Sequence, residues 1–170
     1  MRWILGLGAN LGDAAGALEQ ATQTLVVRAS AQGMRASSIW RTAPLEATGP
    51  DYLNAAVCFE SPLEPLAMLR LTQSIEADAG RERPFRNAPR TLDIDLLLAD
   101  QVVMTLPDLQ LPHPRLHERA FALAPLVELD PECVIPGRGR AVDCLARCTA
   151  QRIDRITAPG APWRAVKAGR

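Results

Sequence analysis

Residues 86–100 read RNAPRTLDIDLLLAD, and the apolar run at their centre, residues 92–98, contains two acids. This alternation is typical of a strand with one buried face, so Asp93 and Asp95 are expected to share the other face. The buried face would carry Leu92, Ile94, Leu96 and Leu98. Two residues of strand rise place the two acids about 6.6 Å apart. Carboxylates at this spacing repel each other, so the strand predicts a cation beside them.

The loop before this strand is broken by proline and rich in arginine, with Arg81, Arg83, Arg86 and Arg90. Magnesium binds one or two carboxylates and fills its other positions with water and phosphate oxygens. Arginine supplies forked donors for the outer oxygens of a polyphosphate. The combination favours a magnesium–polyphosphate site, in which two ions can clamp a transferring phosphoryl group. The alternative is a solvated strand face whose acids pair with arginines.

Hydrophobic periodicity and turn residues predict the order of the remaining elements. Strands are expected at 2–8, 33–41, 52–60 and 90–98, and helices from about 11 to 29, from 61 to 80, near 116–129 and near 141–150. The tetrapeptide Ser61-Pro62-Leu63-Glu64 has the pattern of a capping box at the start of a helix. The order is βαββαβ with C-terminal additions, which predicts an α+β, ferredoxin-like antiparallel sheet with helices on one face.

Three further features bear on the site. Tyr52 and Asn54 share the strand face opposite the core residues, where a ring and an amide could hold a planar heterocycle. Taken in isolation, the two are more simply interpreted as ordinary exposed side chains. His113 lies in a loop, Leu-Pro-His-Pro, where a cation or donor could meet phosphate. The glycines of residues 6–12 have the wrong spacing for a dinucleotide-binding loop, so we interpret them as strand-to-helix backbone geometry.

The composition favours a small-molecule role. A chain of 170 residues with 48% hydrophobic residues fits one domain, and its 19 basic and 19 acidic side chains cancel. This balance disfavours binding to nucleic acid or to a membrane surface. No apolar run approaches the ~18 residues that span a bilayer, and the N-terminus has no signal-peptide organisation. We therefore expect a cytoplasmic protein whose four cysteines are reduced.

Several segments together resemble one enzyme family. They are GLGANLGD (6–13), SSIWRTAPL (37–45), PDYLNAAV (50–57), QSIEADAGR (73–81), RNAPRTLDIDLLL (86–98) and LPHPRLHERAFALAPLVEL (111–129). In this order they resemble the 6-hydroxymethyl-7,8-dihydropterin pyrophosphokinase family of folate biosynthesis, over about residues 3–135. The tail at 150–170 lies outside the resemblance and has no assigned role. Asn87 departs from the pattern, because many members of the family carry tryptophan there.

The resemblance implies a ferredoxin-like monomer that transfers pyrophosphate from MgATP to the pterin's hydroxymethyl oxygen and releases AMP. Asp93 and Asp95 would be the ligands of two magnesium ions, and Asp95 the candidate to receive the proton. Arg81, Arg83 and Arg90 would belong to the mobile loop and triphosphate site. Further nucleotide-site positions would be Gln73, Glu76, His113 and Arg119. Tyr52 and Phe121 would sandwich the pterin, and its edge would be read by Thr42, Asn54 and the backbone around Leu45.

Two other functions remain open from the residues. One is a non-catalytic ferredoxin-like module that binds a nucleotide, which would not need two aligned magnesium ligands. The other is a metal-dependent nucleotide hydrolase, which would share the acids but would not need Tyr52, Asn54 and Phe121.

Overall fold

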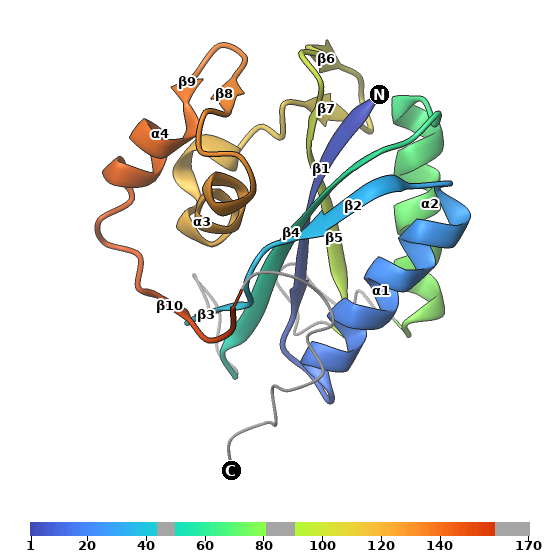
Figure 1. Ribbon diagram of the computed structural model, residues 1–170, viewed down its shortest axis with the longest axis horizontal. Coiled ribbons are helices and arrows are strands. Elements are labelled where there is room, and N and C mark those ends of the chain that lie inside the picture. Colours follow the sequence, from blue (N-terminus) through green and yellow to red (C-terminus); the bar gives the residue numbers. More distant parts are fainter. Residues whose placement is uncertain (44–49, 81–90, 159–170) are drawn as a thin grey trace.

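The computed structural model describes residues 1–43, 50–80 and 91–158, and its centre is an antiparallel sheet (Figure 1). The chain builds it in the order β1 (Arg2–Ala9), α1 (Ala14–Arg28), β2 (Gln32–Ala36), β4 (Tyr52–Glu60), α2 (Pro65–Asp78) and β5 (Asp93–Ala99). In space the strands follow the order β2–β4–β1–β5, with every neighbouring pair antiparallel. This is the ferredoxin-like topology, so the fold predicted from the sequence is confirmed.

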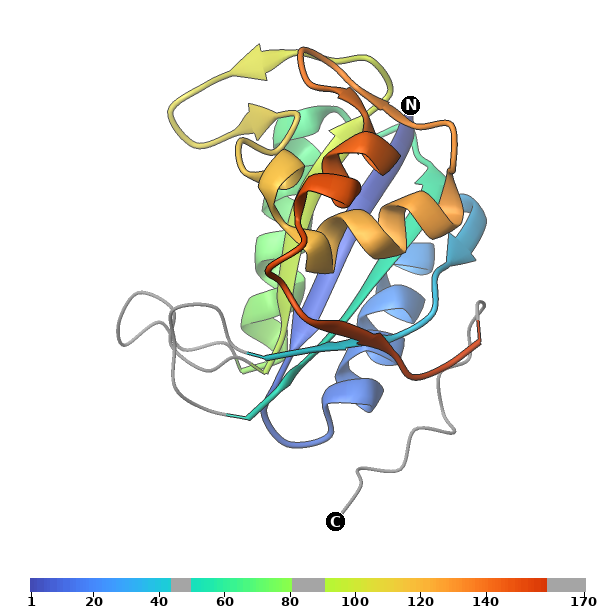
Figure 2. The ribbon, with the colours of Figure 1, turned by 90° about the vertical axis from the view of Figure 1, so that its left-hand side faces the viewer.

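The two faces of the sheet are covered by different helices. Figure 2 shows α3 (Ala120–Leu129) and α4 (Ala141–Arg147) in front of the strands, with α1 and α2 behind them. The smaller elements are η1 (Leu116–Glu118), β3 (Trp40–Thr42), β6 (Met104–Thr105), β7 (Gln110–Leu111), β8 (Val134–Ile135), β9 (Gly139–Arg140) and β10 (Ile153–Arg155). Of the helices in the described ranges, none has the length and apolarity needed to cross a membrane.

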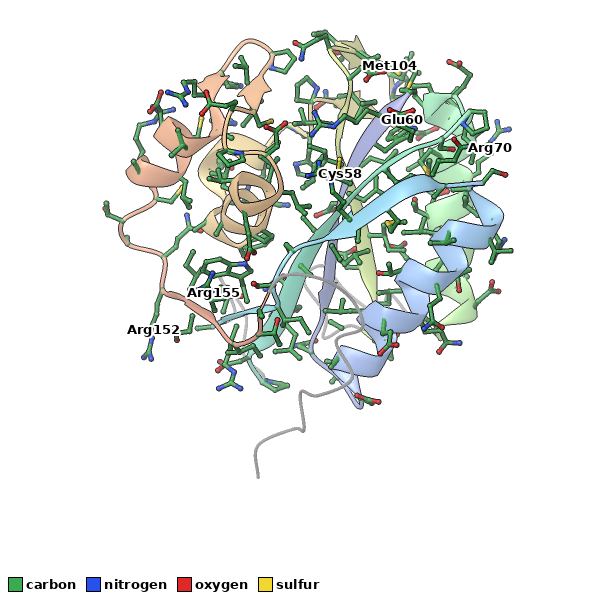
Figure 3. The ribbon with its side chains drawn as sticks, in the orientation of Figure 1. Cys58, Glu60, Arg70, Met104, Arg152 and Arg155 are labelled. Atoms are coloured by element: carbon green, nitrogen blue, oxygen red, sulfur yellow. The ribbon has the colours of Figure 1, made fainter. Side chains whose placement is uncertain are left out.

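Strand β1 lies at the centre of the sheet and contributes side chains to two hydrophobic cores. Its odd-numbered residues Trp3, Leu5, Leu7 and Ala9 are buried between the sheet and the pair α1–α2. Ile4 points to the opposite face, where a second core joins the sheet to α3 and α4. Cys58 of β4 belongs to this second core (Figure 3). All four cysteines of the chain are free thiols.

A bulge in the pairing of β1 with β5 corrects one sequence prediction. Leu5 pairs with Leu96 but Ile4 pairs with Leu98, so Leu97 is an extra residue on β5. An extra residue reverses the alternation beyond it. Leu98 therefore lies in the second core and not on the face of Leu96 as predicted. Asp93 and Asp95 precede the bulge and keep their common face.

Two local predictions also differ from the structure. The strand expected at 33–41 is divided into β2 and β3, because the hydroxyl of Ser37 accepts a 2.9 Å hydrogen bond from Ala56 N between them. The capping box is wrong as well: α2 begins at Pro65 after Glu64, which makes no side-chain cap. The hydroxyl of Ser61 instead donates a 2.6 Å hydrogen bond to the carbonyl of Ala29.

The buried carboxylate of Glu76 connects α2 to β5 and makes a stability prediction. Its side chain is 4% exposed, and Oε1 accepts a 2.7 Å hydrogen bond from Ile94 N. Loss of an acceptor from a buried N–H costs about 1–3 kcal/mol. We expect Glu76→Ala to lower the free energy of unfolding by about 2 kcal/mol in a urea titration. Glu76→Gln keeps an acceptor oxygen and should lose less.

Gln73→Ala provides the matched control, because Gln73 is exposed on the same helix. Its free energy of unfolding should change by less than about 0.5 kcal/mol. Wild-type stability in Glu76→Ala would contradict the anchoring role.

Candidate active site

A cavity of about 310 Å³ opens on the sheet face that carries α3. This volume is in the range of small-molecule binding sites. Its lining residues come from β1, β3, β4, β5, η1, α3 and the C-terminal segment, and include Gly6, Gly8, Thr42, Ala43, Tyr52, Asn54, Asp93, Asp95, Arg115, Glu118, Arg119, Phe121 and Gln151. Seven of the residues singled out in the sequence are among them: Thr42, Tyr52, Asn54, Asp93, Asp95, Arg119 and Phe121.

The floor of the cavity is a stretch of β1 without side chains. Gly8 pairs with Asn54 of β4 on one side and with Asp93 of β5 on the other. Gly6 pairs in the same way with Asp95. Neighbouring strands lie about 4.8 Å apart, so about 10 Å separates the backbones of Asn54 and Asp93. The two glycines lie within the strand, so the interpretation as strand-to-helix geometry fits only Gly12, whose φ is +59°.

Asn54 is held in one orientation. Its side chain is buried, and Nδ2 donates a 2.9 Å hydrogen bond to the hydroxyl of Thr42. A Cβ placed on Gly8 would lie 3.2 Å from Asn54 Oδ1, so a glycine leaves room for this amide. Tyr52 adds a ring from β4, and Phe121 adds a second ring from α3. The cavity therefore offers two aromatic rings and an oriented amide to a planar ligand.

The other end of the floor is charged. Asp93 and Asp95 line the cavity from the same face of β5, and both are half-buried. Nη1 of Arg119 lies 3.6 Å from Oδ2 of Asp95. The Arg119 guanidinium also stands 5.6 Å from the ring centre of Phe121. Burial lowers the pKa of Arg119 and the charge of Asp95 raises it, and an arginine in such a setting stays protonated at neutral pH.

His113 does not line the cavity, but it lies near enough to Asp93 and Arg119 for their charges to shift its pKa. The backbone N–H of His113 donates a 2.9 Å hydrogen bond to the carbonyl of Leu97. Its ring nitrogen Nδ1 accepts a 3.2 Å hydrogen bond from the backbone N–H of Arg115. Burial and then the charge of Arg119 lower the pKa of His113 to about 4, against the opposing effect of Asp93. The imidazole is neutral at pH 7, with its proton on Nε2. It can therefore act as a donor to phosphate and not as a cation.

The acid pair suits magnesium. Within residues 1–43, 50–80 and 91–158 no group of three or more histidine, cysteine or acidic side chains could hold a metal ion. Zinc requires such a set, whereas magnesium binds through one or two carboxylates and completes its shell with water and phosphate oxygens. Asp93 and Asp95 on one open face of a cavity fit the second requirement.

Other candidate residues lie away from the cavity or outside the described residues. Gln73 is exposed on α2, and Glu76 is buried between α2 and β5; neither lines the cavity. Outside the described residues lie Leu45, Arg81, Arg83, Asn87 and Arg90. The roles assigned to all of these positions stay predictions.

Several lining residues were missed from the sequence. Arg115 and Glu118 form an ion pair at the cavity, and this hydrogen bond lowers the pKa of Glu118. Both lie within residues 111–129, so the family pattern covered them without assigning them a role. Gln151 carried no signal, because it follows the region of resemblance.

Comparisons with known proteins identify the relatives of this chain. The family model described as 7,8-dihydro-6-hydroxymethylpterin-pyrophosphokinase matches residues 4–131. The 2-amino-4-hydroxy-6-hydroxymethyldihydropteridine pyrophosphokinase of Methylorubrum extorquens is 38% identical over 91% of this chain and 98% of its own length. The Bacillus subtilis enzyme of the same name is 40% identical over 74% of this chain and 75% of its length. The Pseudomonas aeruginosa enzyme is 33% identical over 94% and 98%.

Solved structures agree on the fold. The chain superposes on an HPPK-DHPS crystallised in complex with substrates with a TM-score of 0.65 at 12% identity, over 86% of this chain and 43% of that one. Plasmodium falciparum HPPK-DHPS with pteroate gives 0.67 at 12% identity, over 88% and 44%.

The environment of His113 predicts its titration. Nitrogen NMR of the imidazole should give a midpoint at about pH 4, with His113→Gln identifying the signal. The unfolded chain binds this proton more readily than the folded one. The free energy of unfolding should therefore fall as the pH is lowered from about 6.5 to about 4. A midpoint at the ordinary value of 6.5 would show that the imidazole is neither buried nor beside Arg119.

Proposed function

The chain belongs to the 7,8-dihydro-6-hydroxymethylpterin-pyrophosphokinase family, and we propose that it transfers pyrophosphate from MgATP to the hydroxymethyl oxygen of 6-hydroxymethyl-7,8-dihydropterin. The products are the pterin diphosphate and AMP. One observation carries this proposal: Asn54, Gly8 and Asp93 lie in one row across three strands. A site for a planar polar ring and a site for a metal–phosphate group thus share one floor.

The pterin is assigned to the end of the cavity with the aromatic rings. Tyr52 from β4 and Phe121 from α3 would enclose its ring system. Asn54 and Thr42 would read its edge, together with the backbone around Leu45. The hydrogen bond between Asn54 and Thr42 supports this assignment, because it fixes which way the amide presents its donor and acceptor.

The nucleotide is assigned to the acidic end. Asp93 and Asp95 would hold two magnesium ions, which when bound neutralise the triphosphate and orient its oxygens. Arg119 supplies a cation from the opposite wall, and His113 supplies a neutral donor. Further contacts to ATP would come from Gln73, Glu76, Arg81, Arg83 and Arg90.

The reaction places few chemical demands on the protein, because phosphoryl-type transfer depends mainly on position and charge. The pterin hydroxymethyl oxygen attacks the β-phosphorus, and the bond from that phosphorus to the α-phosphate oxygen breaks as AMP leaves. The hydroxyl proton passes to Asp95, the carboxylate paired with Gly6 at the floor. Arg81 and Arg90 would take up the charge that develops on the departing phosphate.

The enzyme is further proposed to act as a cytoplasmic monomer on these two small molecules, without nucleic acid or membrane. The equal numbers of basic and acidic side chains support the last part of this proposal, because a net charge of zero gives no overall attraction to polyanions or to anionic membranes.

The release of AMP tests the proposed function. The protein is incubated with MgATP, with and without the hydroxymethyl dihydropterin, and AMP is measured. AMP that forms only with the pterin is the expected result. AMP without the pterin would indicate a nucleotide hydrolase, and no AMP in either case would leave a binding module.

A substitution of the second acid separates chemistry from folding. Asp95→Asn should lower kcat by about a thousandfold while the circular dichroism spectrum stays that of the wild type. Asp100→Asn is the matched control, because Asp100 is an exposed acid just beyond the same strand. Near-normal turnover in Asp95→Asn would remove its proposed role.

The glycine floor predicts a selective defect. In Gly8→Ala the new methyl group would meet Asn54 Oδ1 at 3.2 Å and push the amide away from its position. The KM for the pterin should rise about tenfold, a binding loss of about 1.4 kcal/mol. The KM for ATP serves as the internal reference and should change less than twofold. Unchanged pterin KM would show that the amide does not read the ring.

A further inference from the structure

The amide of Gln151 bridges two backbone groups that lie on either side of Arg119. Oε1 accepts a 2.9 Å hydrogen bond from Ala120 N, and Nε2 donates one of 2.7 Å to the carbonyl of Glu118. Ala120 is the first residue of α3, and the residue before it makes no side-chain cap. The first N–H groups of a helix have no partner within it, so Gln151 supplies one acceptor from a distant part of the chain.

The backbone held by Gln151 carries two residues of the cavity wall. Arg119 reaches to 3.6 Å from Asp95, and Phe121 lines the cavity from the first turn of α3. One side chain, that of Gln151, holds both peptide groups that flank Arg119. The positions of the Arg119 and Phe121 side chains in the cavity therefore depend on Gln151.

After Gln151 the chain runs to strand β3, which lines the cavity with Thr42. β10 pairs with β3, with Ile153 opposite Thr42. Beyond β10, Ile39 N donates a 2.8 Å hydrogen bond to the hydroxyl of Thr157. The short strand β3 is therefore held on both edges, by β4 and by β10. It carries Thr42, the hydrogen-bond partner of Asn54.

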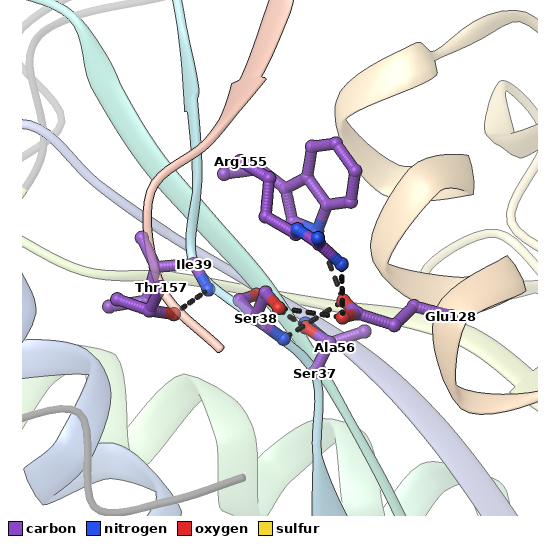
Figure 4. Close-up of polar contacts among 8 residues, drawn as sticks. Ser37, Ser38, Ile39, Ala56, Glu128, Arg155 and Thr157 are labelled. Atoms are coloured by element: carbon purple, nitrogen blue, oxygen red, sulfur yellow. Dashed lines mark hydrogen bonds and ion pairs between the residues drawn. The ribbon is translucent and has the colours of Figure 1, made fainter. Parts of the chain in front are cut away.

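Glu128 of α3 joins the same elements from the helix side (Figure 4). Its carboxylate accepts hydrogen bonds from Ser38 N at 2.9 Å, Ser38 Oγ at 2.6 Å and Trp40 Nε1 at 3.3 Å. Arg155 of β10 lies 3.7 Å from it. With a side chain only 14% exposed, Glu128 anchors α3 to β3 and to β10.

We propose that residues 151–157, the C-terminal strap, set the distance between two walls of the cavity: residues 118–121 at the start of α3, and strand β3. Gln151 is then a positioning residue for the pterin. This inference rests on the proposed function, because it assigns the pterin to the space between those walls. Gln151 acts through the backbone of 118–120. Its loss should weaken pterin binding more than triphosphate binding, because Phe121 is one of the two rings proposed to enclose the pterin. Arg119 is one of several groups proposed to hold the triphosphate, beside Asp93, Asp95 and magnesium.

The experiment compares two variants of Gln151 with a neighbour. Gln151→Met keeps most of the side-chain volume but loses both hydrogen bonds, and Gln151→Ala loses both volume and bonds. Thr149→Ala is the matched control, because Thr149 is exposed and lies two residues before Gln151, outside the strap. Calorimetry measures the Kd of a nonhydrolysable ATP analogue with magnesium, and then of the pterin in its presence.

We expect both Gln151 variants to raise the Kd of the pterin about tenfold, while the Kd of the ATP analogue changes less than twofold. Thr149→Ala should change neither Kd. Wild-type pterin affinity in Gln151→Met would overturn the proposal. Parallel loss of both affinities with a lower unfolding midpoint would also overturn it, since that indicates a merely structural role. If the wild-type protein binds no pterin, both the proposed function and the role of the strap are rejected. If the wild type binds pterin and the Gln151 variants bind it equally well, only the role of the strap is rejected.

Discussion

The absence of side chains at positions 6 and 8 is the constraint on which the site depends. β1 is the central strand, paired with β4 on one side and β5 on the other. A side chain at position 8 would therefore stand between Asn54 and Asp93, and one at position 6 between Ala56 and Asp95. The same strand must also hold the fold together, which it does through Trp3, Leu5 and Leu7 on its other face. Alternation makes both demands compatible within one strand of eight residues. The first core is built from the odd-numbered positions, whereas the even-numbered positions supply Ile4 to the second core and Gly6 and Gly8 to the cavity floor.

The walls around this floor divide the work by chemistry. One end is aromatic and polar, and its Asn54 amide is held by the hydroxyl of Thr42. The other end is charged, with the carboxylates of Asp93 and Asp95 and the guanidinium of Arg119 near Asp95. Arg119, half-buried beside an acid, is retained as a cation, and His113, half-buried beside that arginine, is kept neutral. The charge pattern is therefore set by burial and by neighbours, and it matches a reaction in which a neutral ring meets a polyanion.

Sequence reasoning succeeded where the signal is local. The alternation of β4 and of the first half of β5, and the order of helices and strands, predicted the topology and the common face of Asp93 and Asp95. It failed where distant segments decide. The bulge that turns Leu98 depends on the pairing with β1, and the hydroxyl of Ser61 is taken by the carbonyl of Ala29, 32 residues away. Gln151 acts on the backbone of α3, about 30 residues before it, and no local pattern marks that contact.

The most direct test of this account is a crystal structure with magnesium, a nonhydrolysable ATP analogue and the hydroxymethyl dihydropterin bound together. The account predicts the pterin ring between Tyr52 and Phe121 with its edge on Asn54, and magnesium on Asp93 and Asp95, with Gly8 beneath the gap between them. A pterin bound elsewhere, or two acids that contact no metal, would contradict it.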